Sequence, residues 1–128
     1  MNTKLIMMLS AIFLAAIGIF FSFLPKEAAD FIGISSEKSI QLILQILGAL
    51  YFSFAMLNWM AKGAIIGGIY NKPIAIANFT HFVIGALALL KAMSNPPPYF
   101  IVPLAVVYSI FAILFGVIFF KHPGPEVK

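Results

Sequence analysis

The stretch from Pro73 to Met93, PIAIANFTHFVIGALALLKAM, decides the fold, because it is an apolar run of membrane length that carries Asn78, Thr80 and His81. About 20 apolar residues are needed to cross a bilayer as a helix. Polar side chains are costly in hydrocarbon, so they normally face other helices or a cavity. The run therefore predicts a transmembrane helix with one side turned toward protein, and His81 is its first candidate for a functional residue.

Three further apolar runs accompany this one, at residues 5–24, 40–61 and 99–120, beside the run at 73–93. A chain of 128 residues that is 62% hydrophobic and 9% charged cannot bury its apolar side chains in a soluble core, because soluble domains are closer to half apolar and a quarter charged. The sequence predicts one domain over residues 1–128. It is an all-α membrane protein, folded as an antiparallel four-helix transmembrane bundle.

Small and polar side chains recur at helical spacing on one face of three of these runs. Small residues let helix backbones approach closely in lipid, so we expect these three faces to pack inward. The faces are Ala11, Ala15, Gly18 and Ser22 in the first run, Asn78, His81, Gly85, Ala88 and Ala92 in the third, and Ala105, Ser109, Ala112 and Gly116 in the fourth.

The connections between the runs differ in character. Residues 25–39 hold three of the four acidic residues together with Phe31 and Ile32, a pattern that predicts a short amphipathic segment at the membrane surface. The sequence Asn95-Pro-Pro-Pro98 cannot continue a helix and ends the third run. Pro103 is expected to interrupt the fourth run near its start.

All eight basic residues are lysines at the ends of apolar runs, and this scatter excludes a nucleic-acid-binding face. Four spans would put both termini on one side of the membrane. The side of the termini carries Lys4, Lys62, Lys72, Lys121 and Lys128, against Lys26, Lys38 and Lys91 on the other. By the positive-inside rule, the sequence predicts a multi-pass protein of the inner (plasma) membrane with cytoplasmic N- and C-termini.

Five residues are predicted to meet near the cytoplasmic side. At about 1.5 Å of rise per residue, Asn58 and Asn78 lie at similar depth, His81 about one turn deeper, and Ser10 near the same level. Trp59 belongs at the headgroup level, where its amphipathic ring is favoured. The sequence thus predicts an inner-leaflet pocket formed by Ser10, Asn58, Asn78 and His81 and rimmed by Trp59.

Three interpretations of this pocket stay open. Its side chains can hydrogen-bond across helices and hold the bundle together. Alternatively, Asn78 and His81 donate hydrogen bonds to a lipophilic ligand such as a quinone, a sterol-like lipid or an acyl chain. In the third interpretation His81 binds a metal or haem. His122 lies too far along the membrane normal to pair with it, and we expect no metal and no cofactor.

The sequence lacks the residues that several classes of enzyme and transporter require. No Asp or Glu lies in any apolar run, which argues against paired-carboxylate catalysis and against a proton-coupled antiporter of the small multidrug-resistance kind. Cys is absent, so thiol chemistry and thiolate metal sites are excluded. No Gly-x-Ser-x-Gly motif occurs, and His81 has no acidic partner in its run. A non-catalytic protein is therefore favoured over an enzyme.

The pattern as a whole resembles the DoxX-like group of small bacterial membrane proteins. The resemblance covers four short runs, a longer first connection, Leu47-Gly48-Ala49 ahead of an aromatic and small run, and a Gly-rich turn at Gly63, Gly67 and Gly68 before the Asn-containing third run. It implies a four-helix fold in the bacterial inner membrane. Some members of that group are associated with quinone-linked oxidoreductase complexes, but no motif here carries a specific activity over.

The sequence therefore predicts a small integral membrane protein that is a non-catalytic subunit or a module that binds a lipophilic ligand. The alternatives are a quinone-interacting or enzymatic membrane subunit that uses His81, and a small oligomeric transporter. The expected partners are the lipid bilayer, a lipophilic small molecule or quinone, and a second copy or another membrane-complex subunit. Nucleic acid is not among them.

Overall fold

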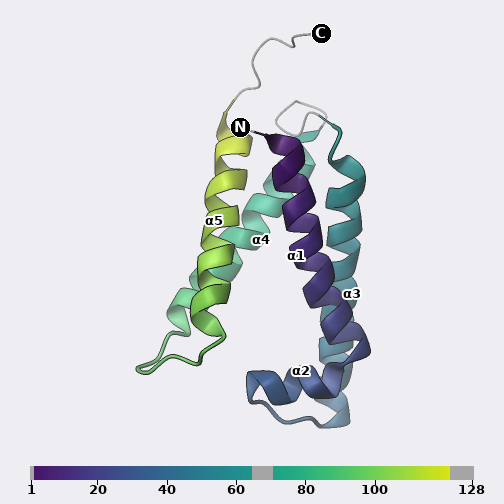
Figure 1. Ribbon diagram of the computed structural model, residues 1–128, viewed down its shortest axis with the longest axis vertical. Helices are drawn as coiled ribbons and strands as arrows, with labels where there is room; N and C mark the ends of the chain where they lie inside the picture. Colours follow the sequence, from purple (N-terminus) through teal and green to yellow (C-terminus); the bar gives the residue numbers. More distant parts are fainter. Residues whose placement is uncertain (1, 65–70, 122–128) are drawn as a thin grey trace. The chain divides into compact units, whose positions relative to one another are not determined.

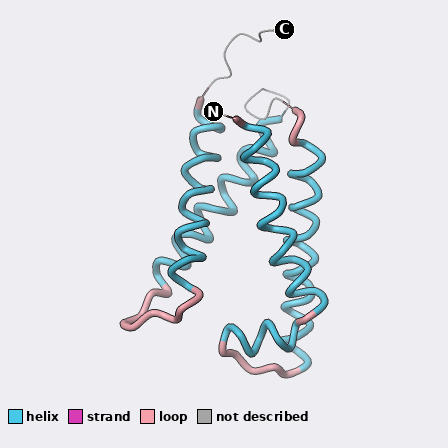
Figure 2. The backbone as a smooth tube through the Cα atoms, in the orientation of Figure 1, coloured by secondary structure: helices cyan, strands magenta, loops and turns pink. Residues whose placement is uncertain are grey.

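The computed structural model describes residues 2–64 and 71–121, and in this part of the chain the regular secondary structure is helical, with loops between the helices (Figures 1 and 2). The helices are α1 (Thr3–Phe23), α2 (Pro25–Ile32), α3 (Lys38–Ala61), α4 (Lys72–Lys91) and α5 (Ile101–Phe120). All except α2 are long and apolar enough to cross a membrane. The prediction of an all-α membrane protein with four such helices is confirmed, and their ends fall within two residues of the predicted ones.

The four long helices expose apolar surface of the kind that lies against the hydrocarbon of a membrane. Only 17% to 33% of the apolar window of each long helix is buried within the chain. Large side chains such as Met60, Ile84 and Ile113 are mostly exposed. Soluble proteins rarely expose contiguous apolar surface on this scale, so the protein is a multi-pass membrane protein.

Two compact units make up the chain, one of residues 7–62 and one of residues 1–6 with 63–128. In the first unit α1 and α3 lie side by side (Figure 1). Gly18 and Gly48 lie where the two backbones come close, because a Cβ added to Gly48 would stand 2.8 Å from the carbonyl oxygen of Gly18 and 2.7 Å from the amide nitrogen of Ser22. The small face predicted for the first run therefore does pack against a neighbouring helix, with backbone in contact with backbone.

The amphipathic segment predicted at residues 25–39 contains the short helix α2. Pro25 begins it, a position where the missing N–H costs nothing. Gly33 ends it at φ 84°, and the amide of Ile34 donates to the carbonyl oxygen of Ala29 at 3.0 Å, which is the long bond of a Schellman motif. Ala28 and Ala29 are fully buried against Leu44, so α2 is fixed to α3 by its apolar face.

In the second unit α4 and α5 form a helical hairpin held by aromatic rings. Phe82 is completely buried and lies against Phe111 and Phe115 of α5, with ring centroids 4.9 and 5.8 Å apart. Nearer the start of α4, Phe79 lies against Phe120 at 5.6 Å. Since later residues of α4 meet earlier residues of α5, the two helices are antiparallel. The antiparallel arrangement of all four long helices, and the single domain, stay predictions.

Two expectations for this hairpin are wrong. Ala88 and Ala92 are exposed, whereas the buried face of α4 runs through Ala75, Asn78, Phe82 and Ala86. The rings of Phe79 and Phe82 set the contact with α5, and the small residues near the end of α4 lie to one side of it. Pro103 does not interrupt α5, because the helix begins only at Ile101 and the N–H groups of a first turn have no helical partner.

Candidate functional site

Ser10 and Asn58, two members of the predicted pocket, are joined directly across α1 and α3. The Asn58 side-chain amide donates to Ser10 Oγ at 3.0 Å, and the Ser10 hydroxyl donates to the carbonyl oxygen of Met7 at 2.9 Å. Both side chains are fully buried. Such a hydrogen bond between helices stabilises a membrane protein by about 0.6 kcal/mol on average, so this pair reinforces the contact at Gly18 and Gly48.

Trp59 follows Asn58 in the chain but lies on the outer side of α3, with 41% of its surface exposed. The Lys62 ammonium stands 4.2 Å from the centre of its indole ring and donates to the Trp59 carbonyl oxygen at 3.3 Å. An indole and an ammonium together are typical of the membrane interface. Trp59 is therefore suited to anchoring the end of α3 at the headgroup level.

Asn78 is fully buried on α4. Its side-chain amide donates to the carbonyl oxygen of Ile74, one turn earlier in the same helix, at 3.0 Å. This bond gives the amide a partner within its own helix and fixes the direction of the side chain.

His81 contacts Tyr108 of α5, a residue that the sequence analysis did not place in the site. Its Nε2 lies 3.1 Å from the hydroxyl of Tyr108 on α5, and the tautomer of the ring decides which of the two donates. The imidazole also packs edge-on against Phe82 at 4.9 Å. Tyr108 is 3% exposed, and the absence of Cβ at Gly85 leaves room for its ring.

The five predicted residues thus divide between the two units. Ser10, Asn58 and Trp59 belong to the unit of residues 7–62, where Ser10 and Asn58 meet. Asn78 and His81 belong to α4, where His81 pairs with Tyr108. Convergence of the two sets into one pocket stays a prediction. In residues 2–64 and 71–121, no three His, Cys, Asp or Glu side chains gather as they would around a metal ion, and His122 lies outside the described residues.

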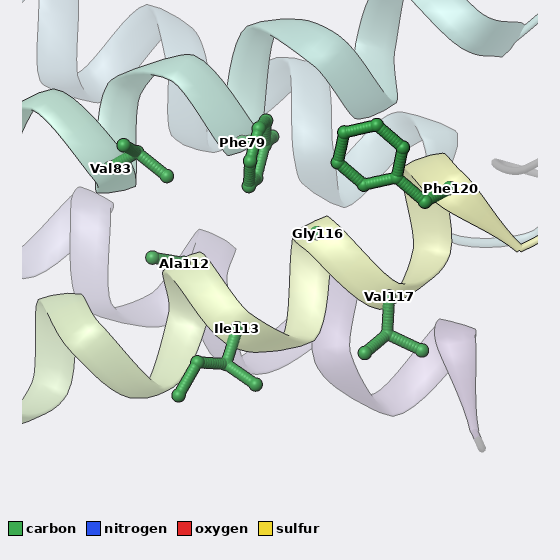
Figure 3. A pocket seen from close by; sticks show the side chains of 7 residues that line it. All are labelled: Phe79, Val83, Ala112, Ile113, Gly116, Val117 and Phe120. Atoms are coloured by element: carbon green, nitrogen blue, oxygen red, sulfur yellow. The ribbon is translucent and has the colours of Figure 1, made fainter.

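A groove of about 440 Å³ is formed by residues of α4 and α5 (Figure 3). It is lined only by apolar residues, which are Phe79 and Val83 of α4 and Ala112, Ile113, Gly116, Val117 and Phe120 of α5. Gly116 helps to form it, because a Cβ there would stand 2.9 Å from the edge of the Phe79 ring. The glycine lets Phe79 lie against the α5 backbone, and open space remains beside the ring.

Sequence reasoning placed Ala112 and Gly116 on a face that packs against another helix and missed the groove. The available signal was only their spacing of four residues on one side of α5. The position of Phe79 against Gly116 is known from the structure alone. Small residues facing one large ring can leave a hollow beside it, whereas small residues facing each other close the gap. The two cases differ only in the residue on the partner helix.

Comparison with protein-family models gives no match to this chain, and the comparisons with curated proteins and with solved structures give none either. The resemblance to the DoxX-like group stays a prediction.

Proposed function

We propose that this small multi-pass membrane protein is a non-catalytic module that holds the hydrocarbon tail of a lipophilic molecule in the groove between α4 and α5. The observation that carries the proposal is the groove itself, about 440 Å³ in volume and lined by apolar side chains alone. Ligand pockets in proteins span roughly 300–1,000 Å³ and are mostly apolar. A lining without polar groups suits a tail and offers nothing to a polar substrate.

The inner membrane of a bacterium, with both termini in the cytoplasm, is the location we propose. The support is the excess of lysines on the side of the termini. A lipid-facing groove in that membrane is reached by lateral diffusion, so the ligand needs no aqueous path. Assembly with a second copy or with another membrane subunit is compatible with the large exposed apolar surface of the long helices.

The groove is tested by filling it. Ala112→Leu places a branched side chain in the groove, and Ala88→Leu makes the same change at an exposed position of α4 outside it. Purified, delipidated protein is titrated with a phospholipid and examined by native mass spectrometry. We expect Ala112→Leu to weaken lipid binding about tenfold, which corresponds to ~1.4 kcal/mol, and Ala88→Leu to leave it unchanged. Equal binding by the wild type and both variants would remove the proposal.

A second candidate function, a quinone-interacting membrane subunit, is favoured by the hydrogen bond between His81 and Tyr108. A hydroxyl and an imidazole can together donate a hydrogen bond to a carbonyl oxygen and exchange a proton with it. The test is the quinone content of the purified protein, measured by solvent extraction and chromatography. Tyr108→Phe keeps the ring and removes the hydroxyl, and it should lower quinone retention several-fold if this candidate is right. Unchanged retention would exclude the pair.

A further inference from the structure

One end of the groove lies at the end of the hairpin where α4 begins and α5 finishes, and two lysines lie there. Phe120, at that end of the groove, is the last residue of α5, and the exposed Lys121 follows it (Figure 3). Lys72 begins α4, and its ammonium lies 5.7 Å from the centre of the Phe119 ring on α5. The start of α4 and the end of α5 therefore bring two ammonium-bearing residues to the same end of the hairpin.

Aromatic rings connect Lys72 to the wall of the groove. Phe119 lies under the ammonium and stacks on Phe79 at 6.2 Å with an angle of 7° between the rings. Phe119 also lies edge-on to Phe120 at 5.0 Å. Phe79 and Phe120 both line the groove. The cation is thus one ring away from the apolar lining, close enough for one molecule to touch both.

No carboxylate neutralises these lysines within the hairpin. Residues 71–121 contain Lys72, Lys91 and Lys121 and no Asp or Glu. Lys91 lies in the last turn of α4, at the opposite end of that helix. Within residues 71–121 this end of the hairpin therefore carries only positive charge, which complements an anion at a membrane surface.

Because the lysines lie at one end of the groove, we propose that the hairpin binds an anionic phospholipid, with an acyl chain in the groove and the phosphate headgroup at Lys72 and Lys121. This inference rests on the proposed function, because it uses the same groove, and it adds the class of ligand. Basic residues near the cytoplasmic surface attract anionic lipids, and each lysine raises the affinity for such a lipid roughly fivefold. The Phe119 ring under Lys72 keeps the ammonium at this end of the groove.

The experiment compares two lipids with identical acyl chains, phosphatidylglycerol and phosphatidylcholine, titrated separately into the delipidated protein and followed by native mass spectrometry. We expect the wild type to bind the anionic lipid more tightly. Lys72→Gln and Lys121→Gln should each lower its affinity roughly fivefold and leave phosphatidylcholine unchanged. Lys91→Gln is the matched control at the other end of α4 and should change neither. All three lysines are exposed, so the variants are expected to fold.

Failure of the headgroup inference differs from failure of the groove. If the wild type binds both lipids equally, or if Lys91→Gln acts as strongly as Lys72→Gln, while Ala112→Leu still weakens both lipids, the groove stands and the role of the lysines is overturned. If Ala112→Leu binds both lipids as the wild type does, the groove is not the site, and the proposed function and this inference both fall, whatever the headgroup preference.

Discussion

The two helix pairs of this protein solve the same packing problem in opposite ways. α1 and α3 meet through backbone, with Gly18 facing Gly48. α4 and α5 meet through rings, with Phe79 laid against Gly116 and Phe82 against Phe111 and Phe115. Glycine against glycine leaves no space between the helices. Glycine against phenylalanine fills one side of the contact and leaves a groove on the other, so the residue opposite a small side chain decides whether a helix pair is closed or leaves a groove beside it.

The polar groups follow the same division. In the first pair, Ser10 and Asn58 are fully buried and joined to each other, an arrangement suited to holding helices together. In the second, His81 is only partly buried and pairs with a tyrosine hydroxyl beside a cluster of rings. We therefore assign the Ser10–Asn58 bond a structural role, and the ligand-binding role that we propose rests on the second pair.

The largest effect is expected from adding a methyl group to the contact between α1 and α3. Gly48→Ala puts a methyl group against the backbone atoms of Gly18 and Ser22, which cannot move without shifting a helix. We expect it to lower the free energy of unfolding in detergent by about 3 kcal/mol. Gly116→Ala meets only the edge of the Phe79 ring, which can turn aside, and should cost about 1 kcal/mol. Unfolding by sodium dodecyl sulfate measures both, and equal losses would refute the distinction between the two pairs.

The sequence was sufficient for the parts of this comparison that depend on one helix at a time. Four apolar runs, the small face of α1 and an amphipathic segment within residues 25–39 all follow from local composition, because lipid imposes length and small residues let helices approach closely. Contacts that depend on rotation of one helix against another did not follow. Ala88 was placed inside and is exposed, and Tyr108 gave no sign in the sequence that it would meet His81.

A smaller effect is expected when a polar side chain within a long helix is compared with one at a helix end. His81→Ala removes a ring that packs against Phe82 and bonds to Tyr108 within the hairpin. Gln41→Ala removes a side chain that donates to the carbonyl oxygen of Ser36 at the start of α3. We expect losses of unfolding free energy of about 2 kcal/mol for His81→Ala and less than about 1 kcal/mol for Gln41→Ala. Thermal unfolding in detergent gives the order, and a reversed order would show that the imidazole adds little to the hairpin.

The smallest expected effects are the losses of stability on removing the Ser10–Asn58 or the His81–Tyr108 hydrogen bond. A double-mutant cycle of Ser10→Ala and Asn58→Ala measures the coupling between two fully buried groups, and we expect about 1 kcal/mol, toward the upper part of the range for bonds between membrane helices. Tyr108→Phe deletes only the hydroxyl that faces His81 and should cost about 0.5 kcal/mol, because the ring contact with Phe82 at 5.1 Å remains. A larger loss from Tyr108→Phe than the Ser10–Asn58 coupling would mean that the α4–α5 pair depends on its polar bond for stability. The His81–Tyr108 pair would then be structural, and ligand binding would rest on the apolar groove alone.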